Sequence, residues 1–310
     1  MIRYLVPRLA YYLSIFLGII FFSFILFHII PSDPARAILG PNAGQSQVES
    51  LRQKLGLDKP LYVQIIRYLV NVAAMDFGHS YVDDRGVFQE VASRLKITLS
   101  LVTISMVITF AYIFLVIVSF LFPPFMKSSN MLDFLMSSMP VFFSGIIVAI
   151  LTLYFYPFTS FSGKLGSVDD ILYLIPPGVV LSFYPMAILS GILKEEMASV
   201  LKSLYITAGR SWGFSDMIIL FRYALKNTLM PLLSTISNIL PMLLTGAFIV
   251  EIIFSIPAIG SLLVKSILER DFPMIECIVI INGAFFVLVN LAFEMIYPLV
   301  NPGIVKGEAV

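Results

Sequence analysis

The chain has 310 residues, of which 59% are hydrophobic and 13% are charged, and its mean hydropathy of +0.95 excludes an ordinary soluble domain. Twenty Lys and Arg residues nearly balance nineteen Asp and Glu residues, so a net charge of +1 offers no basic field for nucleic acid. A single cysteine, Cys277, excludes an intramolecular disulfide, and with only two histidines we expect no metal site.

Six apolar stretches have the length of about 20 residues that a helix needs to cross a bilayer. They are residues 9–30, 98–122, 134–156, 171–193, 229–250 and 277–300. Strands of a membrane barrel would be shorter and would alternate, whereas these stretches are continuous and apolar on every face. We therefore expect an all-α integral membrane protein with six transmembrane helices in one domain, the first of them an uncleaved signal anchor.

Lys and Arg residues in the short loops predict that both termini are cytoplasmic, because such residues are retained on the inner side. In this orientation the inner segments hold nine of them: Arg3, Arg8, Lys127, Lys194, Lys202, Arg210, Arg222, Lys226 and Lys306. The short outer loops hold three: Lys164, Lys265 and Arg270. Six spans also require both termini to lie on one side, so the two observations agree.

Residues 31–97 form the longest outer segment, and Pro and Gly interrupt it too often for an enzyme domain. Helical spacing of apolar residues predicts a short helix over Gln45–Leu55, and Pro60 predicts the start of another over Leu61–Met75. We expect both helices to lie at the outer face without spanning the membrane.

The longest inner loop, residues 194–228, is predicted to contain an amphipathic helix, a tight bend and a second helix. Apolar residues recur at helical spacing over residues 200–208. Gly213 suits the left-handed position that ends a helix, and Ser215 or Asp216 can cap the next one. These signals favour a protruding elbow, and a plain solvated loop between two spans is the alternative.

At this bend the sequence resembles the inner-membrane permease subunits of binding-protein-dependent ABC importers, and more closely the first permease of the dipeptide, oligopeptide and nickel branch. The inner motif of that family places Glu-Ala-Ala shortly before a glycine. Here Ala208 and Gly213 match the motif, whereas Thr207 and Gly209 depart from its Glu and second Ala. The similarity continues downstream as far as Pro231.

Further stretches are similar to the same family, occur in the expected order and cover nearly the whole chain. They are residues 33–37 (DPARA), 55–64 (LGLDKPLYVQ), 77–81 (FGHSY), 250–260 (VEIIFSIPAIG) and 301–303 (NPG). The resemblance implies a type I ABC importer fold in the cell inner membrane, a partner permease, two cytoplasmic ATPase subunits carrying ATP and magnesium, and an extracytoplasmic solute-binding protein. It also implies di- or oligopeptides as the solute, with nickel or another small solute as the alternative.

The sequence contains no G-x-x-x-x-G-K-[ST] phosphate-binding loop, so we expect the chain to be no enzyme and to bind no cofactor itself. Work driven by ATP must then arrive through an inner contact, for which the bend is the structured candidate. We expect the ATPase to contact Tyr205, Thr207, Ala208, Gly209, Arg210, Ser211, Trp212, Gly213 and Phe214. Trp212, the only tryptophan, is expected to be exposed for burial by that partner, and a tryptophan facing lipid headgroups is the alternative.

Polar residues on the fifth predicted span form one stripe, because Ser234, Asn238, Pro241 and Thr245 fall within about 60° of one another on a helical wheel. We interpret the stripe as facing the translocation path, and hydrogen bonding between helices of the bundle is the alternative. In the sixth span, Glu294 near the inner end is expected to reach the interface by snorkelling or to pair with another helix, in preference to a proton-relay role. The absence of an acidic residue at mid-depth disfavours the main rival function, a self-contained ion-coupled carrier.

Overall fold

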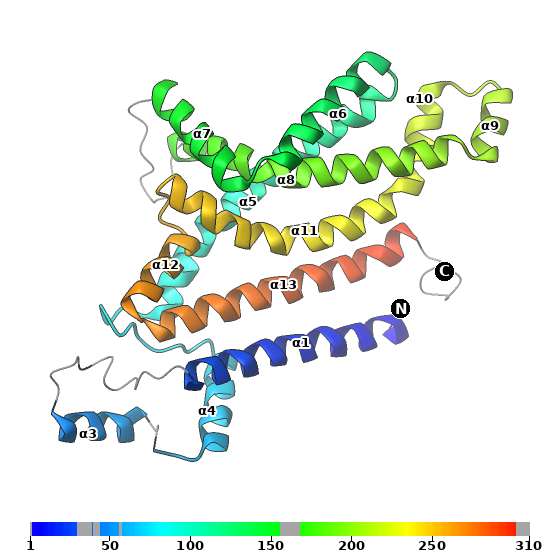
Figure 1. Cartoon of the computed structure of the whole chain (residues 1–310). Coiled ribbons are helices and arrows are strands. Elements are labelled where there is room, and N and C mark those ends of the chain that lie inside the picture. The colour runs from blue at the N-terminus through cyan, green and yellow to red at the C-terminus, as the bar shows by residue number, and fades with distance from the viewer. Residues whose placement is uncertain (1, 30–38, 40–43, 56–57, 156–167, 302–310) are drawn as a thin grey trace.

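Figure 1 shows the computed structural model, which describes residues 2–29, 39, 44–55, 58–155 and 168–301. Within these residues the chain is a bundle of helices, and its one β-type pairing is an isolated bridge between His79 and Gly86. Five of the described helices are long and apolar enough to cross a membrane, and a sixth span results if a bent pair is taken as one. The predicted all-α membrane fold is thus confirmed.

The long helices are α1 (Ile2–Ile29), α5 (Val87–Ser119), α8 (Val168–Leu201), α11 (Leu225–Ile253) and α13 (Phe272–Val300). Between them lie α3 (Gln45–Leu55), α4 (Leu61–Ala73), α6 (Pro123–Ser138), α7 (Val141–Phe155), α9 (Leu204–Ser211), α10 (Asp216–Ile218), the π-helical turn η1 (Ile219–Ala224) and α12 (Ile259–Glu269). Every long helix begins before its predicted apolar stretch. Helical hydrogen bonding continues through polar turns, whereas hydropathy marks only the part suited to lipid.

The third predicted span, residues 134–156, is not one straight helix. The axes of α6 and α7 meet at an angle of 106°, with Met139 and Pro140 between them. The carbonyl of Pro140 accepts hydrogen bonds from the backbone N–H groups of Phe143 and Ser144, so Pro140 starts α7 instead of continuing α6. The last residue of the prediction lies outside the described part of the chain.

The two ends of the bundle differ in what they carry. In Figure 1 the start of α1, the end of α13 and the α9–α10 region lie at one end, while α3, α4 and α12 lie at the other. This is the arrangement expected if the termini and the predicted bend share the inner side of the membrane. We refer to these ends as the inner and outer ends.

The hydrophobic core lies where α5, α8 and α11 pack against one another. Leu101, Leu193 and Ala247, one from each helix, are completely buried there. Gly178 allows α8 to approach α5 closely, because a Cβ atom at this position would lie 2.7 Å from Cγ2 of Ile104. Small residues at helix contacts favour packing inside a bilayer, where apolar side chains gain little from leaving lipid.

A polar cluster holds α6 against α5 and α8 near the inner end. The carboxylate of Asp133 accepts hydrogen bonds from Lys194 Nζ, Tyr112 Oη and Ser190 Oγ, each at 2.6 Å. The side chains of Asp133 and Lys194 are largely buried. Because the carboxylate is bonded on both oxygens, the cost of burying its charge is offset and α6 is fixed in place.

Glu294 connects α13 to the first helix. Its carboxylate forms an ion pair with Arg8 and accepts a hydrogen bond from Tyr4 Oη at 2.7 Å. One turn later, Tyr297 Oη donates to Ser237 Oγ of α11 at 2.9 Å. The predicted pairing of Glu294 with another helix is therefore confirmed.

Replacing Arg8 with alanine is expected to lower the free energy of unfolding by about 2 kcal/mol, because the buried Glu294 carboxylate would lose its cation. Thermal unfolding in detergent micelles measures this loss. Lys127→Ala is the control, since Lys127 is an exposed basic residue of α6 without an ion pair among the described residues. Equal melting temperatures for the two variants would contradict the role given to Arg8.

Candidate functional site

The predicted inner bend is present as a helical elbow, which we define as α9, the turn over residues 212–215, and α10. Helix α8 ends at Leu201, where the N–H groups of Lys202 and Ser203 bond back to its last turn. Helix α9 then begins at Leu204. The single amphipathic helix predicted over residues 200–208 is therefore wrong, because a break at Lys202–Ser203 separates its two halves.

Backbone hydrogen bonds fix the turn at the end of α9. Gly213 has a φ of +85°, the left-handed conformation predicted for it, and its N–H donates to the carbonyl of Arg210 at 3.0 Å. The N–H of Phe214 donates to the carbonyl of Gly209 at 3.1 Å. Ser215 then caps α10, as predicted, by accepting from the N–H of Ile218 through its side chain.

Aromatic rings hold the elbow against the base of α11. The rings of Phe214 and Tyr223 stack with centroids 5.8 Å apart and an interplanar angle of 13°. Trp212 meets the edge of Phe214 at a centroid distance of 6.3 Å. Asn227 donates through Nδ2 to Tyr205 Oη at 2.8 Å. These contacts join the elbow to η1 and to the start of α11.

Gly209 is buried beside the ring of Phe214. A Cβ atom at position 209 would lie 3.3 Å from Cδ2 of Phe214, which is closer than side-chain contacts ordinarily come. Gly209 replaces the second alanine of the family motif, and the absence of a Cβ atom leaves room for the Phe214 ring.

The predicted ATPase-contact residues divide by exposure. Those exposed to the outside of the chain are Tyr205, Thr207, Arg210, Ser211, Trp212 and Gly213; Ala208 and Phe214 are partly buried, and Gly209 is buried. The side chain of Trp212 is 76% exposed, as expected for a residue that awaits a partner. Among the predicted contact residues, the exposed surface thus combines polar side chains with the rings of Tyr205 and Trp212.

Exposed apolar residues next to this set escaped sequence reasoning. Leu204 is 89% exposed, and Met217 and Ile218 are exposed on the other side of the turn. Leu204 is one of the apolar residues that recur at helical spacing over residues 200–208, where a break at Lys202–Ser203 separates α8 from α9. The signal that could have found it is Ser203, a residue type favoured directly before a helix start.

The polar stripe of the fifth span lies on an uncovered face of α11. Ser234, Asn238 and Thr245 are exposed, and Pro241 is partly buried within the helix. Asn238 donates through Nδ2 to the carbonyl of Ser234 in its own helix at 3.0 Å. Among the described residues, no hydrogen bond joins the side chains of the stripe to another helix.

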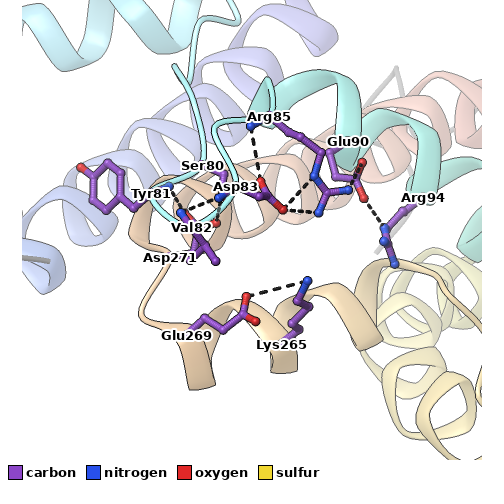
Figure 2. A network of polar contacts seen from close by, with 10 residues as sticks. All are labelled: Ser80, Tyr81, Val82, Asp83, Arg85, Glu90, Arg94, Lys265, Glu269 and Asp271. Atoms are coloured by element: carbon purple, nitrogen blue, oxygen red, sulfur yellow. Dashed lines mark hydrogen bonds and ion pairs between the residues drawn. The ribbon is translucent and has the colours of Figure 1, made fainter. Parts of the chain in front are cut away.

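At the outer end, the loop between α4 and α5 is tied to the start of α13 (Figure 2). Ser80 Oγ and the backbone N–H of Tyr81 both donate to the carboxylate of Asp271, at 2.5 and 3.1 Å. Burial, reinforced by the negative charges of Glu276 and Asp271, raises the pKa of Tyr81 to about 12. The Tyr81 hydroxyl is therefore neutral at physiological pH.

Arginine residues stabilise the rest of the same loop, and Figure 2 shows Arg85 and Arg94 beside Asp83 and Glu90. Arg85 hydrogen-bonds to Asp83 and lies 3.2 Å from Glu90 Oε2, while Arg94 Nε donates to Glu90 Oε1 at 2.7 Å. Hydrogen bonds from Arg85 lower the pKa of Asp83 to about 2. Asp83 is therefore ionised and paired with Arg85 over the physiological pH range.

This loop forms one wall of an outer cavity of about 870 Å³. The cavity is lined by Tyr68, Asn71, Val72, Asp76, Phe77, Gly78, His79, Ser80, Tyr81, Val82, Asp83, Asp84, Pro273 and Glu276. These residues come from α4, the α4–α5 loop and the first turns of α13. None of the cavity residues was predicted from the sequence to form a site, although residues 77–81 belong to the stretches that resemble the family.

Comparison with known proteins adds an independent observation. Residues 126–306 match the family described as binding-protein-dependent transport system inner membrane component, and residues 1–102 match the N-terminal part of such components. A protein of Brucella abortus strain 2308, whose name describes a peptide transport system permease, is 31% identical over 96% of this chain and 97% of its own length. The glutathione transport system permease protein GsiC of Escherichia coli strain K12 is 32% identical over 98% of this chain and 99% of its own.

Proposed function

Because this chain belongs to the family of binding-protein-dependent transport system inner membrane components, we propose that it forms, with a second permease, the path of an ATP-driven peptide importer. It is a multi-pass permease of the inner membrane. In the proposed assembly two cytoplasmic ATPase subunits drive the transport cycle, and a solute-binding protein delivers peptides at the outer end.

The exposed elbow is the observation that carries the coupling part of this proposal. Trp212 and Leu204 are exposed apolar side chains on the elbow, whose Phe214 ring stacks on Tyr223 of η1, directly before α11. Large exposed aromatic and aliphatic groups on a rigid support are typical of residues that a partner buries. The proposal assigns them to a groove of the ATPase subunit, whose movement would displace the base of the fifth span.

The exposed stripe of α11 supports the assignment of the path. A bilayer disfavours polar side chains that face lipid, so Ser234, Asn238 and Thr245 are better placed against a second permease or a water-filled passage. The neighbouring groove of about 280 Å³ includes Pro140 of the α6–α7 bend and Gly246 of α11. Solute is proposed to pass along this side of α11.

ATP and magnesium are proposed to bind to the ATPase subunits and not to this chain. The described residues include no group of three or more His, Cys, Asp and Glu residues that could hold a metal ion. Peptides are favoured as solute because the names of two similar permeases specify peptide and glutathione transport. Nickel or another small solute is the alternative cargo, and a self-contained ion-coupled carrier is the alternative function.

Reconstitution in proteoliposomes tests the proposal. Uptake of a labelled dipeptide is expected only when both permeases, the ATPase subunits, the solute-binding protein and ATP are present. An ATPase variant that binds but does not hydrolyse ATP serves as the control. Labelled nickel in place of the dipeptide tests the alternative cargo, and gradient-driven uptake by this chain alone would overturn the importer assignment.

A further inference from the structure

The outer cavity combines a fixed wall with a largely enclosed carboxylate, that of Glu276, which has no partner in the described part of the chain. Around it, Asp83 is bonded by Arg85, Asp271 by Ser80, and Asp76 accepts from the N–H of Gly78 at 3.0 Å. Because these bonds satisfy the loop from within, the wall keeps its shape without a ligand. The cavity is therefore built before anything enters it.

Glu276 is the exception among these acidic groups. Its side chain is largely enclosed by protein at the cavity wall, one turn into α13, yet it makes no hydrogen bond and no ion pair within the described residues. Removing a carboxylate from water without a partner is unfavourable, and a cation or a hydrogen-bond donor that enters the cavity would relieve this cost. The position thus favours a positively charged occupant.

The remaining lining strengthens the preference for a cation. The cavity lining includes the carboxylates of Asp76, Asp83, Asp84 and Glu276 and no Lys or Arg residue. Tyr68, Phe77 and Tyr81 contribute aromatic rings to the same wall. Carboxylates beside aromatic faces form a good environment for an ammonium or guanidinium group, which gains both ion pairing and cation–π contact.

The location of the cavity indicates which cation it receives. No residue of α11 lines it, whereas the polar stripe proposed for the path lies on α11. An occupant of the cavity is therefore a docked partner and not a solute in transit. A volume of about 870 Å³ exceeds the size of one side chain, so it accommodates a loop that carries the basic residue.

We propose that the outer cavity is a docking socket for a Lys or Arg side chain on the solute-binding protein, with Glu276 as its principal partner. The identity of the protein partner rests on the proposed function. The socket itself does not rest on it, because its geometry, its carboxylate and its aromatic wall are features of the structure. In this assignment the transporter positions the binding protein by charge at a site separate from the path.

Binding of the co-purifying solute-binding protein to the full transporter in nanodiscs tests the socket. Glu276→Gln is expected to raise the dissociation constant at least about tenfold, and Asp84→Asn by a smaller factor. Glu276→Gln removes a carboxyl group that has no partner among the described residues and keeps the side-chain shape, so the fold is expected to persist. Glu49→Gln is the matched control, because Glu49 is an exposed carboxylate of α3 that does not line the cavity.

Carbodiimide coupling provides a second readout that identifies the basic residue. The reagent joins a carboxylate to a nearby lysine amine. Mass spectrometry is therefore expected to find a Glu276–lysine linkage in the wild-type complex and none in Glu276→Gln. A linkage at another carboxylate, with Glu276 unlinked, counts against the socket. An arginine occupant gives no linkage, and the dissociation constants then decide. Unchanged dissociation constants for both cavity variants would overturn the socket, as would a wild-type transporter that binds no solute-binding protein.

Uptake on the same preparations separates this inference from the proposed function. If Glu276→Gln leaves binding-protein affinity unchanged but weakens uptake of a lysine-containing dipeptide alone, the cavity receives the solute and docking is overturned. If docking depends on Glu276 while ATP drives no uptake, the importer assignment fails and the socket stands. If uptake depends on ATP but Glu276→Gln leaves both the dissociation constant of the solute-binding protein and the uptake unchanged, the socket fails and the importer assignment stands.

Discussion

Replacing Trp212 with alanine is expected to reduce ATP-driven peptide uptake at least about tenfold while leaving membrane insertion and melting temperature unchanged. The reason is that Trp212 is 76% exposed and contacts its own chain through one edge-on ring, so its removal costs this chain little. At an interface, loss of a central tryptophan commonly costs about 2 kcal/mol or more, which is roughly thirtyfold in affinity. Peptide uptake measures the loss of transport, and co-purification of the ATPase subunit measures the loss of affinity.

Leu268→Ala is the control for Trp212→Ala. Leu268 is 78% exposed on α12 at the outer end of the bundle, so it matches Trp212 in exposure and differs in location. A Gly213→Pro variant tests the turn itself, because proline cannot adopt the φ of +85° found at this position. Full uptake by both Trp212→Ala and Gly213→Pro would show that the ATPase acts elsewhere.

Replacing Glu251 with alanine is expected to lower the free energy of unfolding by about 3 kcal/mol or more. Glu251 is completely buried, and its carboxylate accepts from Thr98 Oγ1 and from the N–H of Gly260, each at 2.6 Å. The N–H of Ile259 donates in turn to Thr98 Oγ1 at 3.2 Å. Removal of the carboxylate would leave these donors buried without acceptors and would open a cavity between α5, α11 and α12.

Thermal or denaturant unfolding in micelles measures the effect of Glu251→Ala. Glu251→Gln is expected to recover part of the loss, because an amide keeps the shape and can accept from Gly260 while it donates to Thr98. Glu269→Ala is the control: Glu269 is a more exposed carboxylate of α12, 3.9 Å from Lys265, and its loss is expected to cost at most about 0.5 kcal/mol. Similar stability of the two alanine variants would disprove the structural role of Glu251.

Sequence reasoning succeeded where the chemistry is local. Long apolar stretches identified the spanning helices because the bilayer requires a fixed length of apolar helix. Gly213 and Ser215 revealed the turn of the elbow, since a left-handed conformation and a cap depend on the residue itself. Both features depend only on residues that are neighbours in the chain, so they can be predicted from a single sequence.

Sequence reasoning failed where the structure depends on distant contacts. The bonds of Glu251 reach residues 98 and 260, and the outer cavity combines a loop near residue 80 with Glu276 of α13. Neither group forms a spacing pattern along the chain. Pro140 indicates an interruption of the third span, but the angle of 106° between α6 and α7 could not be predicted, because hydropathy records how apolar a residue is and not the direction of its helix.

The π-helical turn η1 determines which way the elbow points. A π turn holds about one residue more than an α turn, so η1 places one extra residue between the elbow and α11. Deleting a single residue from Ile219–Ala224 would restore an α turn and rotate everything before it by about 100° around the helix axis. Trp212 would then remain exposed but would point in a different direction around the helix axis. An ATPase subunit positioned for the native elbow would no longer meet this side chain.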